Sequence, residues 1–381
     1  MDFSWTDEQL ALRQEAVAFA ESQLNEPVWE RPGSDESLRS RWEKCAAFGV
    51  QGLSLPNQYG GMELDALTTA LIMEGLGYGC SDNGLLFAIN AQMWSVQMPI
   101  LTFGTPEQKS EWLPRFARGE SIGAHGMTEP GSGSDAFSLT TRAQRRQGGY
   151  LLNGAKTFVT NAPVADVALV FAKVDSGAGM AGITAFLVPT DVEGLTVGRP
   201  IEKMGLNTAR MGELAFDDCF VPERHRLGPE GNGAAIFHSS MEWERACLLA
   251  CQVGRMERQL ETCISYARDR EQFGQAIGKF QSVSNRIADM KVRLEASRLM
   301  VYRVAWMKTM NRSAALESAM VKLFLSEAFL RSSEDAIRIH GGYGYTTEGE
   351  VEQDARDAFG GILYSGTSDL QRVVISRLLG L

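Results

Sequence analysis

The order of hydrophobic and polar positions gives the chain three textures, and the first is helical. Thr6 opens a capping-box pattern, and the amphipathic run behind it continues through Leu24. Thr105 followed by Pro106 has the pattern of an N-cap and a first helical residue. Between these two runs, residues 56–61 have the sequence Pro-Asn-Gln-Tyr-Gly-Gly, which predicts a loop. The first part of the chain is therefore expected to be helical.

The second texture begins near residue 121, where short apolar runs alternate with turn residues. Such close spacing is typical of an antiparallel barrel or sandwich. Gly154 is expected to form a turn after the first of these runs. The expected strands are residues 150–154, 156–160, 165–173, 182–188 and 212–216.

After Gly233 the helical periodicity returns and holds almost to the end. Ile287, Met290, Leu294 and Val301 lie near one face of a long expected helix. The order α, β, α predicts an α+β multidomain chain. We expect an N-terminal α-helical domain over residues 1–120, a middle β-domain over 121–232 and a C-terminal α-helical domain over 233–381.

The composition removes several classes of function. The chain has 381 residues and a formal net charge of −10. This acidic balance argues against broad binding to nucleic acid or to anionic membranes. No stretch reaches about 18 uninterrupted apolar residues, so no membrane span is expected. The acidic first residues lack the apolar segment of a signal peptide, so we expect a cytoplasmic protein.

The cysteines and histidines argue against metal and disulfide chemistry. The six cysteines include no Cys-x-x-Cys pair, which favours buried free thiols in a reducing compartment. Cys247 and Cys251 are four residues apart on an expected helix and would share a face. The four histidines are scattered along the chain, so no metal site is expected.

Several glycine-rich segments could approach a cofactor. Residues 128–135 have the sequence Thr-Glu-Pro-Gly-Ser-Gly-Ser-Asp, whose amides and hydroxyls suit a phosphate or a polar ring edge. The same segment could be a tight turn between domains, and it matches neither standard nucleotide fingerprint. Residues 268–274, 340–344 and 364–368 are further breaks, each of which taken singly is more typical of a helix cap or a surface charge pair.

Residues 241–245, Met-Glu-Trp-Glu-Arg, place two carboxylates on an expected helix before an apolar run. Glu242 and Glu244 are two apart and point to different faces. One carboxylate could be solvated while the other points inward and acts as a general base near neutral pH. The alternative is a charged face on which Arg245 pairs with a carboxylate.

Taken together and in this order, these segments resemble the acyl-CoA dehydrogenase family over essentially the whole chain. The motifs are residues 127–135, 153–161 (Asn-Gly-x-Lys-Thr-Phe-Val-Thr-Asn), 270–274 (Arg-Glu-Gln-Phe-Gly), 280–281, 339–344 (Ile-His-Gly-Gly-Tyr-Gly) and 364–372. The resemblance implies an α-domain, a β-domain and a C-terminal four-helix bundle, usually in a homotetramer, with FAD between the β-domain and the C-terminal helices.

The resemblance also assigns residues. Phe158 stands where many members have tryptophan over the flavin ring, and Arg338 stands where glutamine is common. Residues Arg270, Phe273 and Gln281 would hold the FAD of a neighbouring subunit. The full set implied for FAD is Met127, Thr128, Gly133, Ser134, Phe158, Thr160, Arg270, Phe273, Gln281, Arg338, Gly341, Gly342 and Thr367. The set implied for the substrate is Ser134, Arg245, Tyr364, Ser365 and Gly366.

One departure from the family pattern is informative. Many members carry the catalytic glutamate directly before the Gly-Thr of the last motif, where this chain has Ser365. A second branch, which includes isovaleryl-CoA dehydrogenases, places the base on a helix in a setting that aligns with residues 241–245. That alignment gives Glu244 the role of the base. The implied reaction is α,β-dehydrogenation of an acyl thioester, with Glu244 removing the α-proton and flavin N5 accepting hydride.

Within the family, the chain resembles prolyl-carrier-protein dehydrogenases at residues 161–166, 237–244 and 280–286. The resemblance therefore favours an acyl or aminoacyl thioester on a carrier protein, with electrons passing to an acceptor protein or to oxygen. Two alternatives are an ordinary isovaleryl-type acyl-CoA dehydrogenase and a flavin monooxygenase on the same fold, which needs no α-proton base. Arg142, Arg145 and Arg146 could meet an acidic carrier, or could form a solvated hairpin tip.

Overall fold

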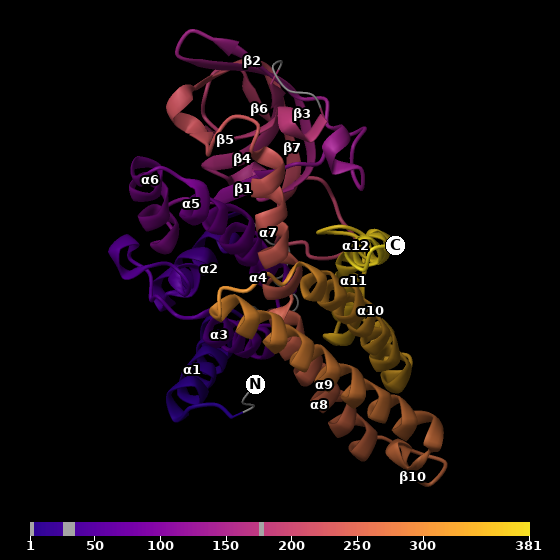
Figure 1. The fold of residues 1–381 in the computed structure, drawn as a ribbon. Helices are drawn as coiled ribbons and strands as arrows, with labels where there is room; N and C mark the ends of the chain where they lie inside the picture. Colours follow the sequence, from indigo (N-terminus) through magenta and orange to yellow (C-terminus); the bar gives the residue numbers. More distant parts are fainter. Residues whose placement is uncertain (1–3, 26–34, 175–178) are drawn as a thin grey trace.

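A computed structural model of the protein describes residues 4–25, 35–174 and 179–381. Figure 1 shows helices of the first part of the chain beside the sheet, and long helices of the last part that extend away from it as an arm. The confirmed order is α, β, α. The N-terminal helices are α1 (Asp7–Gln23), α2 (Asp35–Phe48), α3 (Ala66–Gly79), α4 (Asn83–Gln92), the π-helical turn η4 (Met93–Gln97), α5 (Met98–Phe103) and α6 (Pro106–Ala117).

Both predicted helix starts are confirmed by their capping hydrogen bonds. The Thr6 hydroxyl accepts from the Gln9 amide at 3.2 Å, and the Gln9 side chain accepts from the Thr6 amide at 3.1 Å. Thr105 and Gln108 make the same reciprocal pair at the start of α6. Two otherwise unpaired amide groups are satisfied at each end, which is why these polar residues fix where the helices begin.

The middle of the chain forms one eight-stranded sheet with the order β6-β7-β3-β2-β4-β5-β8, and β1 also pairs with β4. Most neighbours are antiparallel as predicted, but β1 and β2 both run parallel to β4. The strands are β1 (Gly123–Gly126), β2 (Arg142–Arg146), β3 (Gly149–Thr160), β4 (Val167–Val174), β5 (Ile183–Pro189), β6 (Leu195–Val197), β7 (Met211–Pro222) and β8 (Arg226–Leu227).

The predicted turn at Gly154 is wrong, because β3 continues through it as a single strand. Gly154 has φ +141° and lies at a shift in the pairing of β3 with β7. A Cβ atom there would approach the Cα of Thr141 to 2.7 Å, so the close contact requires glycine. A second shift lies between Lys156 and Val159. Glycine in a strand pattern here marks a bulge and not a chain reversal.

The C-terminal helices carry the arm. They are α7 (Gly233–Cys247), α8 (Ala250–Asp269), α9 (Gln281–Thr309), α10 (Ala315–His340), α11 (Val351–Gly361) and α12 (Ser368–Leu378), and the hairpin β9 (Glu271–Gln272) and β10 (Gln275–Ala276) joins α8 to α9. The helix is interrupted between α7 and α8, so Cys247 and Cys251 lie on two helices and not on one as predicted. All six cysteines are free and buried.

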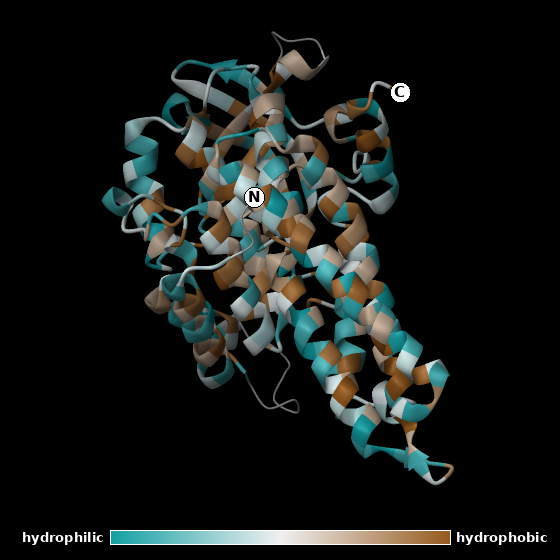
Figure 2. Cartoon of the chain, turned by 60° about the horizontal axis from the view of Figure 1, so that its bottom comes forward, coloured by the Kyte–Doolittle hydropathy of each residue, from teal (hydrophilic) through white to brown (hydrophobic). Residues whose placement is uncertain are grey.

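One hydrophobic core joins the N-terminal helices to the C-terminal ones, and two further cores pack on the sheet. Met290, Leu294 and Val301 are buried in the first core, as their periodicity predicts. Figure 2 shows hydrophobic and hydrophilic positions alternating along the long helices, as expected of helices that bury one face. In the described ranges, the helices lack the combination of length and apolar character that a bilayer span requires.

Candidate active site

The two carboxylates of α7 have different partners. Glu242 accepts hydrogen bonds from the Lys308 ammonium and from the Ala314 amide, each at 2.6 Å. These contacts tie α7 to α9 and to the start of α10. Glu242 is only 17% exposed, and both donors bind the same carboxylate oxygen, so it serves as a structural contact. This favours Glu244 as the candidate base.

Glu244 points the other way and is held by two hydroxyl groups. Ser95 donates a hydrogen bond to one carboxylate oxygen, and Ser365 donates one to the other. Ser95 comes from the π-helical turn η4, whereas Ser365 lies between α11 and α12 with φ 54°. The sequence pattern singled out Ser365 but gave no signal for Ser95, because nothing in residues 93–97 distinguishes a π turn from an α-helix.

A stacked pair of indoles lies beside this carboxylate. The rings of Trp94 and Trp243 are 5.7 Å apart between centroids, with an interplanar angle of 6°. Trp94 donates to the Asn90 side chain at 2.7 Å, and the Lys308 ammonium lies 4.7 Å from the Trp243 ring centre. Trp94 directly precedes Ser95, and Trp243 directly precedes Glu244. The stacked rings therefore fix the register between η4 and α7.

The turn that carries Ser365 is fixed by Gln371 and Arg245. Gln371 donates to the carbonyl oxygens of Ser365 and Gly366 at 3.1 and 3.0 Å, and Arg245 donates to the Ser365 carbonyl at 3.5 Å. The Thr367 hydroxyl caps α12. Five residues were expected to bind the substrate. Four of them lie next to Glu244 or in the turn that carries Ser365: Arg245, Tyr364, Ser365 and Gly366.

Arg245 does not pair with a carboxylate as the charged-face alternative supposed. Within the described residues, no carboxylate oxygen lies within 4.0 Å of its guanidinium nitrogens. Burial lowers the pKa of the Arg245 guanidinium, and the charge of Glu244 opposes that shift. A partly buried cation therefore stands next to Glu244 without neutralising it by direct contact.

Tyr364 is held by polar and aromatic neighbours that the sequence did not reveal. Gln252 donates to its hydroxyl at 2.6 Å, and the ring of Phe87 lies 4.6 Å from its ring. Lys322 is 0% exposed, donates to the Gly361 carbonyl at 2.7 Å and lies 5.7 Å from the Tyr364 ring centre. Burial lowers the pKa of Lys322 to about 7 and raises that of Tyr364.

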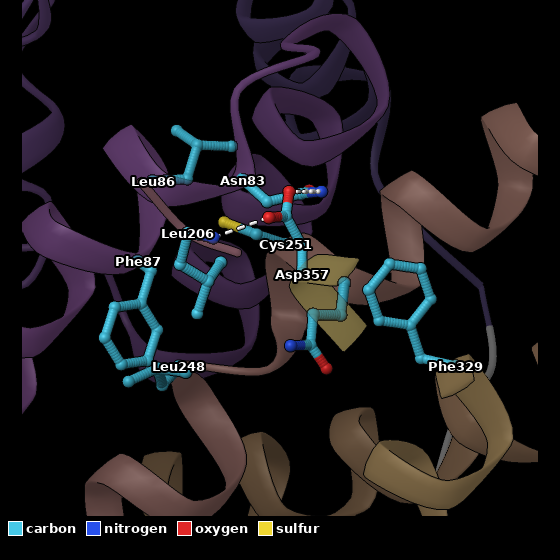
Figure 3. Close-up of a pocket in the computed structure, with 9 residues that line it drawn as sticks. Asn83, Leu86, Phe87, Leu206, Leu248, Cys251, Phe329 and Asp357 are labelled. Carbon is cyan, nitrogen blue, oxygen red and sulfur yellow. Dashed lines mark hydrogen bonds between the residues drawn. The ribbon is translucent and has the colours of Figure 1, made fainter. Parts of the chain in front are cut away.

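A small pocket lies among α4, α8, α10 and α11. Figure 3 shows Asp357 directed toward Asn83, from which it accepts a hydrogen bond at 2.9 Å. Burial raises the pKa of the Asp357 carboxyl to about 6. Neither Glu244 nor Ser365 is among the residues that line it, so this pocket is not the centre of the candidate site. Its walls are Asn83, Leu86, Phe87, Leu206, Leu248, Cys251, Gln252, Phe329 and Asp357.

The loop after β1 is anchored at its root and open at its tip. Lys156 on β3 forms an ion pair with Glu129 at 2.8 Å and donates to the Met127 carbonyl at 3.2 Å. Burial opposes the charge of Glu129, but Lys156 and the Thr140 and Thr141 donors outweigh it and hold the pKa of that carboxyl at about 2. Met127 is buried, Thr128 is half-buried, and Gly133 and Ser134 are exposed.

The Phe158 ring is exposed and could stack against a planar ligand. Its side chain is 61% exposed, its φ is 54°, and it sits at the second pairing shift of β3. Thr160, half-buried, ends the same strand. A Cβ added at Gly131 or Gly133 would meet nothing within 4 Å, so the backbone of that loop is open to a ligand. An exposed aromatic face beside exposed amides and hydroxyls fits a flavin, which has an aromatic ring with polar edges.

The remaining residues expected to hold FAD gather elsewhere, at the far end of the arm. Figure 1 shows β10 at the end of the arm most distant from the sheet. Phe273 in that hairpin is 94% exposed with φ 52°. The end of α10 lies beside the end of α8, which leads into this hairpin. The ring centroids of Tyr266 in α8 and His340 in α10 are 4.3 Å apart. The residues placed there are Arg270, Phe273, Gln281, Arg338, Gly341 and Gly342.

One chain therefore does not bring the arm residues and Phe158 to a single place. Gly341 has φ +60°, and a Cβ on it or on Gly342 would meet nothing within 4 Å. Arg338 forms an ion pair with Glu334 along its own helix. The arm thus offers open backbone and an exposed aromatic ring, as it would if it met a second copy of the chain.

Comparisons with known proteins cover nearly the whole chain. The N-terminal, middle and C-terminal domain models of acyl-CoA dehydrogenase match residues 6–120, 124–219 and 231–380. L-prolyl-[peptidyl-carrier protein] dehydrogenase of Pseudomonas fluorescens is 46% identical over 342 residues, 90% of each chain.

Two solved structures are similar over the full length. The crystal structure of the prolyl acyl carrier protein oxidase AnaB has a TM-score of 0.96 and 49% identity, covering 99% of this chain and 100% of that one. The structure of PigA with FAD and proline has a TM-score of 0.96 and 41% identity, covering 100% of both chains.

Proposed function

The chain belongs to the acyl-CoA dehydrogenase family, and we propose that it oxidises an L-prolyl group held as a thioester on a carrier protein. It is an FAD-dependent oxidoreductase. The observation that carries the proposal is the placement of Glu244 between Ser95 and Ser365, in a chain 46% identical to a prolyl-carrier-protein dehydrogenase.

Glu244 is the proposed α-proton base. Two hydroxyl donors orient its carboxylate toward the site, and a carboxylate held in place can accept a proton from the substrate. The thioester carbonyl acidifies the neighbouring C–H bond, and donors near Ser365 and Gly366 stabilise the negative charge that develops on the carbonyl oxygen. Bound FAD supplies the acceptor for the hydride that leaves the β-carbon.

The rest of the predicted set supports binding of FAD. Met127, Thr128, Gly133 and Ser134 would meet the flavin and the thioester from the loop after β1, Phe158 and Thr160 would meet the ring from β3, and Thr367 would face the pyrophosphate. The buried Glu129–Lys156 pair fixes the loop from below. These roles rest on the open backbone and the exposed ring described above.

We propose that the chain works as a homotetramer, in which the arm of one copy completes the FAD site of another. The 94% exposure of Phe273 supports this, because a large apolar ring in water is otherwise unfavourable. Division of the chain into domains at residues 1–120, 121–232 and 233–381 is part of the same proposal. Six buried free thiols suit a reducing compartment such as the cytoplasm.

The arginine cluster is a weaker candidate for carrier docking than its density suggested. Arg145 pairs with Glu230 and lies 3.8 Å from Glu223, and Arg146 donates to Gln144 on the same hairpin. The carboxylates of Glu223 and Glu230 offset the charge of Arg145, whereas the hydrogen bond to the neutral Gln144 leaves the charge of Arg146 in place. The solvated-hairpin interpretation is therefore preferred for Arg145.

The test compares carriers with everything else held constant. L-proline is loaded on a carrier protein and separately on CoA, and flavin reduction is followed without oxygen while mass spectrometry detects loss of hydrogen from the prolyl group. We expect reduction by the carrier-bound substrate. Turnover of isovaleryl-CoA or another free acyl-CoA, with none on any carrier, would overturn the proposal in favour of an ordinary acyl-CoA dehydrogenase. In a parallel reaction run in air, an oxygenated product in place of loss of hydrogen would instead indicate a monooxygenase.

A further inference from the structure

We propose that Ser95 is a positioning residue for Glu244, and that the π-helical turn η4 serves to bring the Ser95 hydroxyl onto that carboxylate. The inference rests on the proposed role of Glu244 as the base and adds a residue from a different domain to it. The Ser95 hydroxyl donates to the carboxylate oxygen that Ser365 leaves free.

The π turn interrupts one long helix at this place. Helices α4 and α5 flank η4 without a loop, and the Met98 amide donates to the Met93 carbonyl, a bond that spans five residues. One residue more than an α-turn rotates the side chains on the two sides of the turn by about 100° relative to each other. Asn90 and Ile100 can both stay buried while Ser95 faces α7.

The neighbouring residues fix this geometry. Ser95 follows Trp94 and Glu244 follows Trp243, so the stacked indoles and the hydroxyl–carboxylate contact form two adjacent steps between the same pair of segments. Trp94 is itself held by Asn90, and Trp243 by Lys308. A register error of one residue between η4 and α7 would break both contacts together.

Ser95 is 1% exposed, and in the described structure its hydroxyl donates to Glu244. A hydrogen bond from a hydroxyl favours the charged form of a carboxylate. Loss of one donor out of two should therefore weaken the ionised form and free the side chain to rotate. Both effects act on proton abstraction, but only the first moves its dependence on pH.

Other titratable groups face Glu244 and must be separated from this effect. The electrostatic neighbours of Glu244 are His125 of β1, Arg245 of α7, Lys322 of α10 and Tyr364. Burial lowers the pKa of His125 and that of Lys322, the latter to about 7, so either could add a limb to the pH profile. A Lys322→Met variant identifies any limb that belongs to that lysine.

The experiment measures the pH dependence of anaerobic flavin reduction in single turnover for Ser95→Ala. We expect a rate roughly tenfold lower and an acid limb displaced by about one pH unit to higher pH, since a hydrogen bond to a charged group is worth about one such unit. Ser365→Ala should displace the limb in the same direction. Ser95→Cys keeps the shape with a weaker donor and should fall between Ser95→Ala and the wild type.

The matched control is Ser297→Ala. Ser297 is also buried, but its hydroxyl has no hydrogen-bond partner among the described residues, so its loss should leave rate and profile unchanged. A readout independent of turnover is the infrared band of the Glu244 carboxylate, isolated as the difference from Glu244→Gln and titrated with acid. Its midpoint should move to higher pH in Ser95→Ala, even if that variant binds FAD poorly.

The outcomes separate this inference from the function it rests on. If Glu244→Gln reduces flavin as fast as the wild type, the proposed base is wrong. If Glu244→Gln is inactive while Ser95→Ala keeps the wild-type profile and infrared midpoint, Ser95 does not position Glu244. A slower Ser95→Ala with an undisplaced limb and midpoint would likewise overturn the inference, because it would show only a packing defect.

Discussion

The hydroxyl of Ser365 donates a hydrogen bond to the carboxylate of Glu244, although the two residues are 121 positions apart. The family resemblance implies that one branch places its base at the position of Ser365 and another at that of Glu244. In this chain the two positions are in direct contact. A carboxylate at either position can therefore reach the same small volume.

This contact predicts that a base can be moved between the two positions. Glu244→Gln should slow flavin reduction by roughly 10²–10⁴-fold, and Ser365→Glu in that background should restore part of the loss. Stopped-flow reduction by the carrier-bound substrate measures both. Ser365→Gln in the same background is the control for size. Equal rates for the Glu and Gln variants at position 365 would show that a carboxylate at this position cannot replace Glu244 as the base.

The buried pair Glu129–Lys156 predicts a loss of stability in acid. The folded pKa of Glu129 is about 2, below its ordinary value of 4.5, so its contribution to stability is complete above about pH 4.5 and is lost as the pH falls toward 2. Lys156→Met leaves a buried carboxylate unpaired and should destabilise the protein by about 3–5 kcal/mol. Thermal unfolding from pH 3 to 7 checks both statements.

Loosening of the loop after β1 should accompany that change. Because Lys156 also holds the Met127 carbonyl, Lys156→Met should weaken FAD binding as well as stability. Lys173→Met, a substitution on strand β4 of the same sheet and outside this pair, is the control. Normal flavin affinity in Lys156→Met would mean that the Glu129–Lys156 ion pair does not control the position of the exposed loop residues Gly133 and Ser134.

The fully buried Lys322 predicts a different pH dependence. Its folded pKa of about 7 lies below its ordinary value of 10.5, so folding disfavours the charged form, and stability should rise with pH between about 7 and 10.5. The free energy of unfolding of the wild type minus that of Lys322→Met should rise by about 1.4 kcal/mol per pH unit in this window. Denaturant titrations at pH 7.5 and 9.5 measure it. A constant difference would show that Lys322 titrates normally.

The exposed ring of Phe273 predicts self-association through the arm. Phe273→Ala should reduce the oligomer measured by light scattering and lower the amount of FAD bound per chain, if a neighbour's arm completes the site. Met62, 42% exposed in the N-terminal part, provides a control in Met62→Ala. A fully assembled, flavin-saturated Phe273→Ala protein would argue against a role for this ring at the interface.

The sequence predicted secondary structure well at positions where a residue type has a single structural role. Thr6 and Thr105 begin their helices because their hydroxyls satisfy free amides, and this is visible in the sequence. Gly154 misled, because glycine serves both turns and close contacts, and only the neighbour Thr141 decides which. The parallel pairing of β1 and β2 with β4 depends on the path of the loop between them.

The candidate site was predictable only through motifs. Glu244 and Ser365 could be named by their alignment with a family, but their contact is tertiary and no local pattern encodes it. Ser95 and Lys322 are ordinary residues within helical stretches, and their significance comes from what packs against them. Phe158 was named as a ring partner, but its outward direction depends on the shift in pairing within β3.

The most direct test of the account compares Glu244→Gln with Glu242→Gln. Both substitutions remove one carboxylate from α7, but Glu242 holds Lys308 whereas Glu244 faces Ser95 and Ser365. The measurement is the rate of anaerobic flavin reduction by L-prolyl carrier protein, with flavin content checked for each variant. The account predicts a loss of roughly 10²–10⁴-fold for Glu244→Gln and a rate near the wild type for any folded Glu242→Gln. A fast Glu244→Gln enzyme with normal FAD content would contradict it.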